Sequence, residues 1–486
     1  MLFNSVHFLF FFPLVTFFFF VLPHRVRWVW LLMASCYFYM SFLPAYILVL
    51  FFIILVDYVA GIGIETSVGI RRKILLITSL VANIGLLVIF KYYNFIVSSL
   101  PDFSHTPDGA NSLPLISWAL PIGLSFHTFQ AMSYTIEVYR GNQRAERHLG
   151  IYALYVLFYP QMVAGPIERP QNILPQLHTR QVFNYENVVR GLQLMAWGFF
   201  KKIVIADRLS PMVDSVYGHP KQFMGPSLVL ATVLFSFQIF CDFSGYSDIA
   251  LGSARVMGYK LMTNFDRPYF SKNITEFWRR WHISLSTWFR DYVYIPLGGN
   301  RVPMWRQAFN LFLVFMLSGI WHGANWTFVI WGGLHGLYLF VELLARRGKK
   351  QLTSSPVFIK KILRIGLTFS LVSFAWIFFR ASSVQDAFYI ISHLTTGWQY
   401  TWNHLSNPEF VRTHLLLKES KQLFTAALLA IVLMEVVHYL QRNPSWQTRF
   451  RMQPTWIRWS VYYVGILLIL LFGAFNKPSQ FIYFQF

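Results

Sequence analysis

Windows of about 20 apolar residues recur along the whole chain and are separated by short clusters of Arg and Lys. An α-helix of this length spans the hydrocarbon core of a bilayer. Charged residues make up only 13% of the chain, against about 25% in soluble domains, so the sequence lacks the polar surface that water requires. The pattern predicts an all-α integral membrane protein, with residues 1–486 forming a single polytopic domain.

The basic clusters predict how the spans are oriented. If the clusters face the cytoplasm, as the positive-inside bias requires, both termini lie on the external side of the membrane. The net charge of +21 is divided among these clusters rather than gathered in one patch, so we expect membrane lipid as a partner and no nucleic acid. The clusters are suited to attract either anionic lipid or the phosphates of a cytoplasmic cofactor. The expected spans cover residues 6–22, 26–42, 45–64, 74–97, 116–138, 362–379, 423–440 and 460–475, with an external polar loop at 101–112 and basic clusters at 71–73, 140–147, 346–350 and 442–458.

Residues 150–346 do not divide into simple spans. Full apolar runs (227–240, 309–320 and 324–340) alternate with amphipathic ones (184–209 and 273–297). Such segments usually lie along the interface or re-enter the membrane, and irregular backbone at membrane depth requires surrounding protein or a cavity. We therefore expect this region to form a walled funnel.

The strongest candidate site is His322, in a run that continues into a second glycine-containing segment. Gly319 and Gly323 are four residues apart, as are Gly332 and Gly336, so the two helices can pack closely at these positions. Ionisable groups inside apolar segments are costly and often mark a site. The residues alone leave two interpretations open: a structural histidine in a helix interface, or a catalytic one.

A second group lies between residues 273 and 292. At helical spacing Trp278, Trp281, Leu285 and Trp288 share one face, and an interfacial helix anchored by tryptophan explains most of them. It does not explain His282, which becomes the second candidate.

Two further groups are polar. Asp242, Tyr246 and Asp248 follow an apolar run and indicate either a polar vestibule or a structural turn. A stripe of four residues, one helical turn apart, is expected to face another helix or a cavity and is assigned no chemistry: His127, Gln130, Tyr134 and Glu137. No His-Glu-x-x-His pair, P-loop, Rossmann fingerprint or Gly-x-Ser-x-Gly elbow occurs in context, and we expect no metal site.

Several of these stretches together resemble the membrane-bound O-acyltransferase family, and within it the bacterial alginate O-acetyltransferase branch. The resemblance is carried by residues 276–296, with Trp278-Arg279-Arg280-Trp281-His282 and Arg290-Asp291-Tyr292, and by 318–323, 121–139, 162–175 and 242–252. It implies a funnel of about eleven membrane helices, with core motifs in residues 121–340.

The resemblance also implies a reaction. The family's catalytic histidine matches His322, the general base, and a second family position matches His282. The implied donor is cytoplasmic acetyl-CoA, and the acceptor is an extracytoplasmic polysaccharide (alginate, peptidoglycan, cellulose or similar), reached through a periplasmic acetyltransferase or esterase-like partner at the bacterial inner membrane. A neutral imidazole suits the base, and His282 or an indole N–H near Trp321 is the candidate oxyanion donor. Asp242, Tyr246 and Asp248 are assigned to the pocket.

The tail, residues 476–486, contains Phe481-Ile482-Tyr483-Phe484-Gln485-Phe486. It looks like the aromatic C-terminal motif of the small partner peptide in teichoic acid D-alanylation. We hypothesise that Tyr483 accepts the acyl group and passes it to the external partner; an interfacial aromatic anchor is the alternative.

Two other classes of function remain open from the residues. A glycan or acyl-donor transporter also buries polar groups, although it predicts two related halves with broken helices, which the sequence does not show. A scaffold without chemistry is the third possibility. Neither requires His322.

Overall fold

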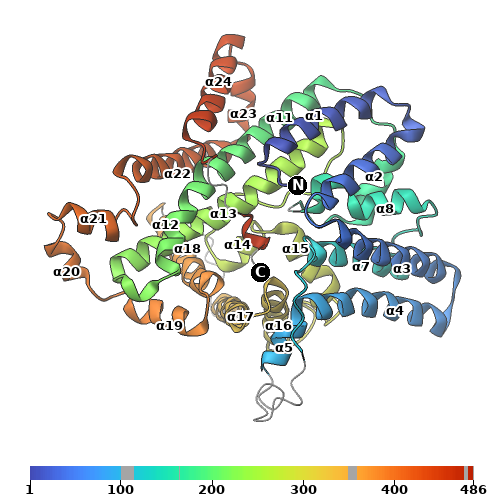
Figure 1. Cartoon of the computed structure of the whole chain (residues 1–486). Coiled ribbons are helices and arrows are strands. Elements are labelled where there is room, and N and C mark those ends of the chain that lie inside the picture. Colours follow the sequence, from blue (N-terminus) through green and yellow to red (C-terminus); the bar gives the residue numbers. More distant parts are fainter. Residues whose placement is uncertain (100–113, 164, 348–357, 476–479, 485–486) are drawn as a thin grey trace. The chain divides into compact units, whose positions relative to one another are not determined.

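The computed structural model describes residues 1–99, 114–163, 165–347, 358–475 and 480–484, and every regular element within these ranges is helical (Figure 1). The expected polar loop at 101–112, the Lys349-Lys350 pair and residues 476–479 and 485–486 of the tail lie outside the described residues. The prediction of an all-α membrane protein is confirmed.

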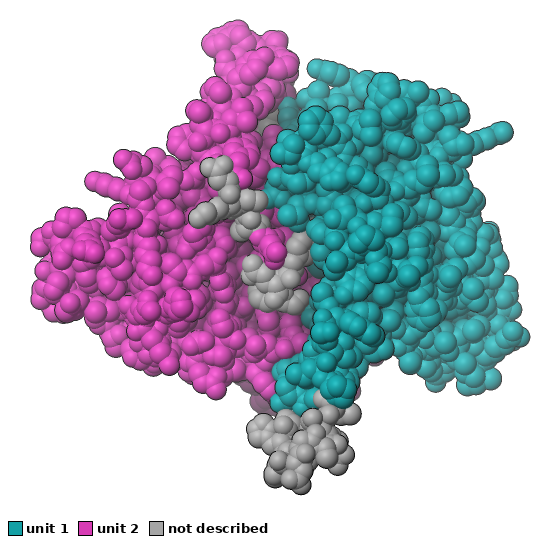
Figure 2. Space-filling view, viewed as in Figure 1, with its two compact units in different colours: residues 1–195, 247–263 teal, residues 196–246, 264–486 magenta. Residues whose placement is uncertain are grey.

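The chain forms two compact units, which Figure 2 colours separately. Unit 1 contains residues 1–195 and 247–263, and unit 2 contains 196–246 and 264–486. Two helices, α11 (Tyr185–Phe199) and α13 (Gly225–Val256), contribute residues to both units.

Unit 1 is built largely from antiparallel helices connected by short turns. Its other elements are α1 (Val6–Val21), α2 (His24–Met40), η1 (Pro44–Tyr46), α3 (Ile47–Thr66), α4 (Gly69–Leu87), η2 (Val88–Tyr92), α5 (Tyr93–Ser99), α7 (Leu124–Arg140), α8 (Leu149–Leu157), α9 (Tyr159–Met162) and α10 (Pro170–His178). Helices α3, α4 and α7 meet around a buried carboxylate, Asp57, which accepts hydrogen bonds from Ser79 (2.5 Å) and Asn83 (2.9 Å). Such partners offset the cost of burying a charged group.

Unit 2 contains the remaining long helices and several short ones. Its elements are η3 (Phe200–Ala206), α12 (Asp207–Tyr217), η4 (Pro220–Gln222), η5 (Pro268–Phe270), α14 (Ile274–Trp278), α15 (Ile283–Phe289), η6 (Arg290–Tyr294), α16 (Met304–His322), α17 (Trp326–Arg347), α18 (Phe358–Arg380), α19 (Val384–His393), α20 (Trp398–Asn403), α21 (Pro408–His414), α22 (Lys421–Gln441), α23 (Pro444–Arg451), α24 (Thr455–Phe472) and η7 (Ile482–Phe484).

Seven helical segments of the described residues are long and apolar enough to cross a membrane: Pro44–Thr66, Gly69–Ser99, Gly225–Val256, Trp326–Ala345, Phe358–Arg380, Lys421–Gln441 and Thr455–Phe472. Helix α1 is apolar but shorter. The expected spans at 45–64, 362–379 and 423–440 agree closely with these bounds. The figure of about eleven membrane helices is not confirmed, and the funnel and the single domain stay predictions.

Helices α16 and α17 form a close antiparallel pair because glycine faces backbone in both. A Cβ added to Gly319 would lie 2.4 Å from the Phe328 carbonyl oxygen, and one added to Gly332 would lie 2.4 Å from that of Phe315. The predicted close packing is confirmed at these two positions. Gly323 instead ends α16 and faces the ring of Phe328.

Two expectations about local structure are wrong. Residues 273–292 do not form one helix, because α14 ends at Trp278 and α15 begins at Ile283, so Trp278 and Trp288 belong to different helices. All four residues of that proposed face are buried rather than exposed at an interface. Asp242 and Tyr246 are not in a turn after a span, because α13 continues without a break to Val256.

The polar stripe on α7 faces α8, and another helix was one of the two surroundings expected for it. The imidazole Nδ1 of His127 bonds the Val156 carbonyl at 3.0 Å, and Gln130 donates to the Tyr155 carbonyl at 2.6 Å. All four residues of the stripe are buried.

Candidate functional site

His322 is the last residue of α16 and lies in a cage of aromatic rings within unit 2. The closest approach of α16 and α17 at Gly319 and Gly332 brings Trp331 against it, with ring centroids 4.9 Å apart. Phe379 of α18 lies at 5.4 Å and Trp321 at 5.0 Å. The imidazole is only 3% exposed, so its proton exchange is shielded from bulk water.

His282 lies at the break between α14 and α15 with a left-handed backbone, φ 44° and ψ 56°. This conformation is uncommon for a residue with a Cβ and persists only where its surroundings hold it. Asn264 stabilises this conformation. Its main-chain carbonyl oxygen accepts from the Ile283 amide at 2.9 Å, and its side-chain Oδ1 lies 3.1 Å from His282 Nδ1.

The tautomer of His282 follows from this contact. The Ser284 amide also donates to Asn264 Oδ1, at 3.3 Å, which identifies that atom as the acceptor oxygen. The Nδ1 atom of His282 must then carry the hydrogen that it donates. Burial lowers the pKa of His282 to about 3, so the ring is neutral at physiological pH and its Nε2 is a lone-pair acceptor.

The tail returns to the same cluster. The Tyr483 ring lies 5.6 Å from His322 and 6.4 Å from His282, centroid to centroid, and 4.4 Å from Phe243 of α13. Its hydroxyl oxygen is buried, although the residue as a whole is partly exposed. Burial, reinforced by the charge of Asp242, raises the pKa of the Tyr483 hydroxyl well above its usual range.

Asp242 anchors the tail through the backbone. Its Oδ2 accepts a 2.7 Å hydrogen bond from the Ile482 amide, and its Oδ1 lies 2.6 Å from the Lys202 ammonium. Phe481 beside this bond is fully buried and its ring lies 4.6 Å from that of Tyr246.

Lys202 reaches Asp242 because two backbones approach closely. A Cβ on Gly245 would lie 2.8 Å from the Gly198 carbonyl oxygen. Just beyond this contact the chain winds as a π-helix, η3, which carries Lys202; such segments often occur at functional sites. Lys202 also pairs with Asp207 at 2.7 Å. Burial alone would lower the Lys202 pKa, but the two carboxylates outweigh it and raise that pKa.

Five of the six pocket and catalytic residues predicted from the sequence, together with Tyr483, lie in this cluster of unit 2: His322, His282, Trp321, Asp242 and Tyr246. Asp248 does not. It lies six residues after Asp242 on α13, about 240° around the helix axis, in the segment assigned to unit 1, and is half-buried.

Sequence reasoning missed three residues that organise the cluster. Asn264 has no motif to mark it, and Phe243 is one of 50 phenylalanines. Lys202 did carry a signal, since two lysines interrupt an apolar pattern there, but Asp242, through which it joins the cluster, lies 40 residues away. Among the described residues, no three His, Cys, Asp or Glu side chains are grouped closely enough to hold a metal ion.

The chain is similar to known acyltransferases over most of its length. The profile of MBOAT, the membrane-bound O-acyltransferase family, matches residues 86–384, which include His282 and His322. The probable alginate O-acetylase AlgI of Azotobacter vinelandii is 37% identical, over 84% of this chain and 81% of that protein. The peptidoglycan O-acetyltransferase of Helicobacter pylori is 33% identical, over 94% and 91% respectively. A teichoic acid D-alanyltransferase of Bacillus subtilis is 30% identical, over 62% of this chain and 76% of that protein.

The family match and the two O-acetylating relatives identify the kind of chemistry, and the apolar helices identify its setting. The chain is a membrane enzyme, an acyltransferase that belongs to the membrane-bound O-acyltransferase family.

Proposed function

We propose that this enzyme transfers an acetyl group from acetyl-CoA to a hydroxyl of an extracytoplasmic polysaccharide, at the bacterial inner membrane and with both termini outside. The observation that carries the proposal is the meeting of His322, His282 and the Tyr483 ring in one buried aromatic cluster. The relatives named for alginate and peptidoglycan O-acetylation support this class of acceptor.

His322 acts as the general base in the proposed reaction. The raised pKa of the Tyr483 hydroxyl makes it a poor nucleophile unless a base removes its proton during attack. With His322 as that base, the phenol oxygen bonds to the thioester carbonyl carbon, the carbon–sulfur bond breaks, and the proton passes through the imidazole to the leaving thiolate.

Trp321 is a better oxyanion donor than His282. Acyl transfer needs hydrogen-bond donors at the carbonyl oxygen as negative charge develops. Neutral His282 uses its N–H on Asn264, so its Nε2 can only accept a hydrogen bond. The Trp321 indole, whose ring lies 6.3 Å from His282, can only donate through its N–H. We therefore assign the oxyanion to Trp321 and a second proton-accepting role to His282.

In this proposal Tyr483 carries the acetyl group between two acceptors. A hydroxyl of a periplasmic acetyltransferase or esterase-like partner attacks the tyrosyl ester, a bond to its oxygen forms, and the phenol leaves and recovers a proton. An aryl ester is more reactive than an alkyl ester because phenoxide is the better leaving group. The partner then delivers the acetyl group to the polysaccharide.

Release of free CoA from acetyl-CoA by the purified protein tests the enzyme. His322→Gln, which keeps hydrogen-bonding capacity but is not a base, should lower turnover by about 100-fold or more. His219→Gln, at an exposed histidine, is the matched control and should behave as the wild type. Equal turnover in the two variants contradicts the role of His322.

The carrier step has a separate test. Intact-mass and peptide analysis after incubation with acetyl-CoA should detect one added acetyl group on Tyr483. Tyr483→Phe should abolish both that mass and transfer to the partner, whereas Tyr463→Phe, at an exposed tyrosine, should not. Full transfer by Tyr483→Phe would leave the acyltransferase proposal intact and remove the carrier.

A further inference from the structure

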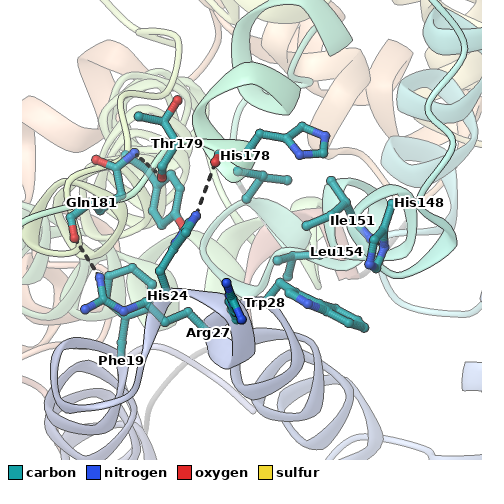
Figure 3. Close-up of a pocket in the computed structure, with 13 residues that line it drawn as sticks. Phe19, His24, Arg27, Trp28, His148, Ile151, Leu154, His178, Thr179 and Gln181 are labelled. Carbon is teal, nitrogen blue, oxygen red and sulfur yellow. Dashed lines mark hydrogen bonds between the residues drawn. The ribbon is translucent and has the colours of Figure 1, made fainter.

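A cavity of about 230 Å³ lies within unit 1, and its lining contains none of the residues assigned to the acyl-transfer site. It is bounded by the end of α1, the start of α2, the start of α8 and the end of α10. Figure 3 shows Arg27 beside Gln181 at one side, His24 bonded to the His178 carbonyl, and Trp28 beside Leu154 and His148 at the other side.

Five basic or imidazole side chains line the cavity: His24, Arg25, Arg27, His148 and His178. No Asp or Glu occurs among its described lining residues. Glu146, which is outside the lining, pairs with His178 at 2.7 Å and accepts from the His148 amide at 2.8 Å. Two arginines, which are always charged, therefore face the cavity without a lining carboxylate to neutralise them.

The two arginines differ in how they are held. Arg27 is 8% exposed and fixed, because it donates to the carbonyls of Gln181 (2.6 Å), Leu22 (2.9 Å) and Phe20 (3.1 Å), the first of which Figure 3 shows. These partners are neutral, so its positive charge remains. Arg25 is exposed and makes no hydrogen bond or ion pair within the described part of the chain. It is free to close on a ligand.

The opposite wall is apolar and closely fitted. Trp28 rests against His148, with ring centroids 4.6 Å apart, and over Gly150, where an added Cβ would come within 2.1 Å of the indole. Phe19 and Leu154 complete this wall. A basic side facing an apolar one fits a ligand with a phosphate group attached to an apolar body.

The volume of the cavity and its location limit the kinds of ligand that it can hold. Pockets for drug-sized molecules occupy about 300–1,000 Å³, so 230 Å³ accommodates a headgroup and not a whole nucleotide cofactor. Exposed apolar side chains run along α1 from Val6 to Val21, and the basic residues begin at His24. This change from apolar to basic is typical of the depth of the lipid phosphates.

We propose that this cavity binds a phosphate ester, with the headgroup of an anionic membrane phospholipid as its source. Arg25 closes on the phosphate, Arg27 supplies fixed positive charge, and the Trp28 wall receives the glycerol and first acyl carbons. The site is independent of the acyl-transfer chemistry.

Native mass spectrometry of the purified full chain tests the proposal with three probes: dihexanoyl phosphatidylglycerol, dihexanoyl phosphatidylcholine and inorganic phosphate. The anionic lipid should bind in preference to the zwitterionic one. Arg25→Gln should weaken its binding about tenfold, the usual effect of losing one charge-assisted hydrogen bond. Arg71→Gln, at an exposed arginine of another basic cluster, should have no effect.

Thr179→Trp provides a second variant, since it fills the cavity mouth at an exposed position without removing charge, and should also weaken binding. If inorganic phosphate binds as well as the lipid and depends on Arg25, the phosphate site stands and a soluble ester is its source. Equal binding of the two lipids, or equal affinities for Arg25→Gln and Arg71→Gln, overturns the proposal.

Discussion

Replacing Asp242 by alanine removes the side chain that accepts a hydrogen bond from the backbone of the tail. The Ile482 amide then loses a buried acceptor at 2.7 Å. Lys202 keeps its second partner, Asp207, at 2.7 Å, so the buried ammonium is not left unpaired and the helices around it should stay folded. The substitution therefore acts mainly on the docking of the tail.

The magnitude follows from the kind of bond that is lost. A buried backbone N–H deprived of its acceptor costs about 1–3 kcal/mol, and hydrogen bonds to charged acceptors lie toward the upper end. A loss of about 2 kcal/mol corresponds to about a 30-fold rise in the undocked population. Asp242→Asn keeps an acceptor oxygen without the charge and should give a smaller rise, about fivefold.

Hydrogen–deuterium exchange of peptides that contain Ile482 measures this population, because the amide exchanges when its bond opens. Asp214→Ala is the matched control, since this acid pairs with Arg380 on the surface and its side chain is 50% exposed. Unchanged exchange at Ile482 in a folded Asp242→Ala protein would refute the argument that this bond holds the tail.

Three further outcomes are expected. Gly332→Ala should lower thermal stability by about 1–3 kcal/mol, because the new Cβ meets a backbone carbonyl at 2.4 Å; Gly366→Ala, with no atom within 4 Å, should be neutral or stabilising in the same melting assay. Asn264→Ala should lower CoA release at least tenfold, because His282 loses the side chain that holds it. Asn264→Asp keeps the acceptor oxygen and should restore part of that activity. Equal rates of CoA release in the two variants would contradict this positioning role. Burial raises the pKa of Glu168 from 4.5 to about 7. The free energy of unfolding is therefore unaffected by this group below pH 4.5 and falls by about 3 kcal/mol as the pH rises from there through 7. Melting curves of the wild type should show this decline and those of Glu168→Gln should not.

Helices with one continuous apolar face could be predicted well from the sequence. The expected span at 423–440 matches α22, Lys421–Gln441, because Glu435 and His438 alone bring ionisable groups into an otherwise apolar stretch. The close approach of two helices at Gly319 and Gly332 could also be predicted from the sequence, since glycines four residues apart lie on one helix face and leave room for a neighbouring backbone.

The cluster around the histidines was harder to predict from the sequence, because contacts between residues far apart in the chain create it. The break at His282 depends on Asn264, which lies 18 residues earlier and forms no recognisable pattern with it. The same difficulty applies to Asp242. An apolar run followed by acids suggests the end of a helix, yet Lys202 neutralises the charge and lets α13 continue.

Asp242 accepts its hydrogen bond from the main-chain amide of Ile482 and not from a side chain. Residues 480–483 therefore behave as a ligand that is covalently tethered to its own receptor, and such tethering gives an effective concentration on the order of millimolar. A free peptide of the same sequence would have to outcompete that local concentration in the full-length enzyme. In a chain truncated before residue 480, Asp242 lacks the Ile482 amide as a partner and the same peptide should bind without competition, which makes the truncated enzyme the more sensitive target for tail-mimicking inhibitors.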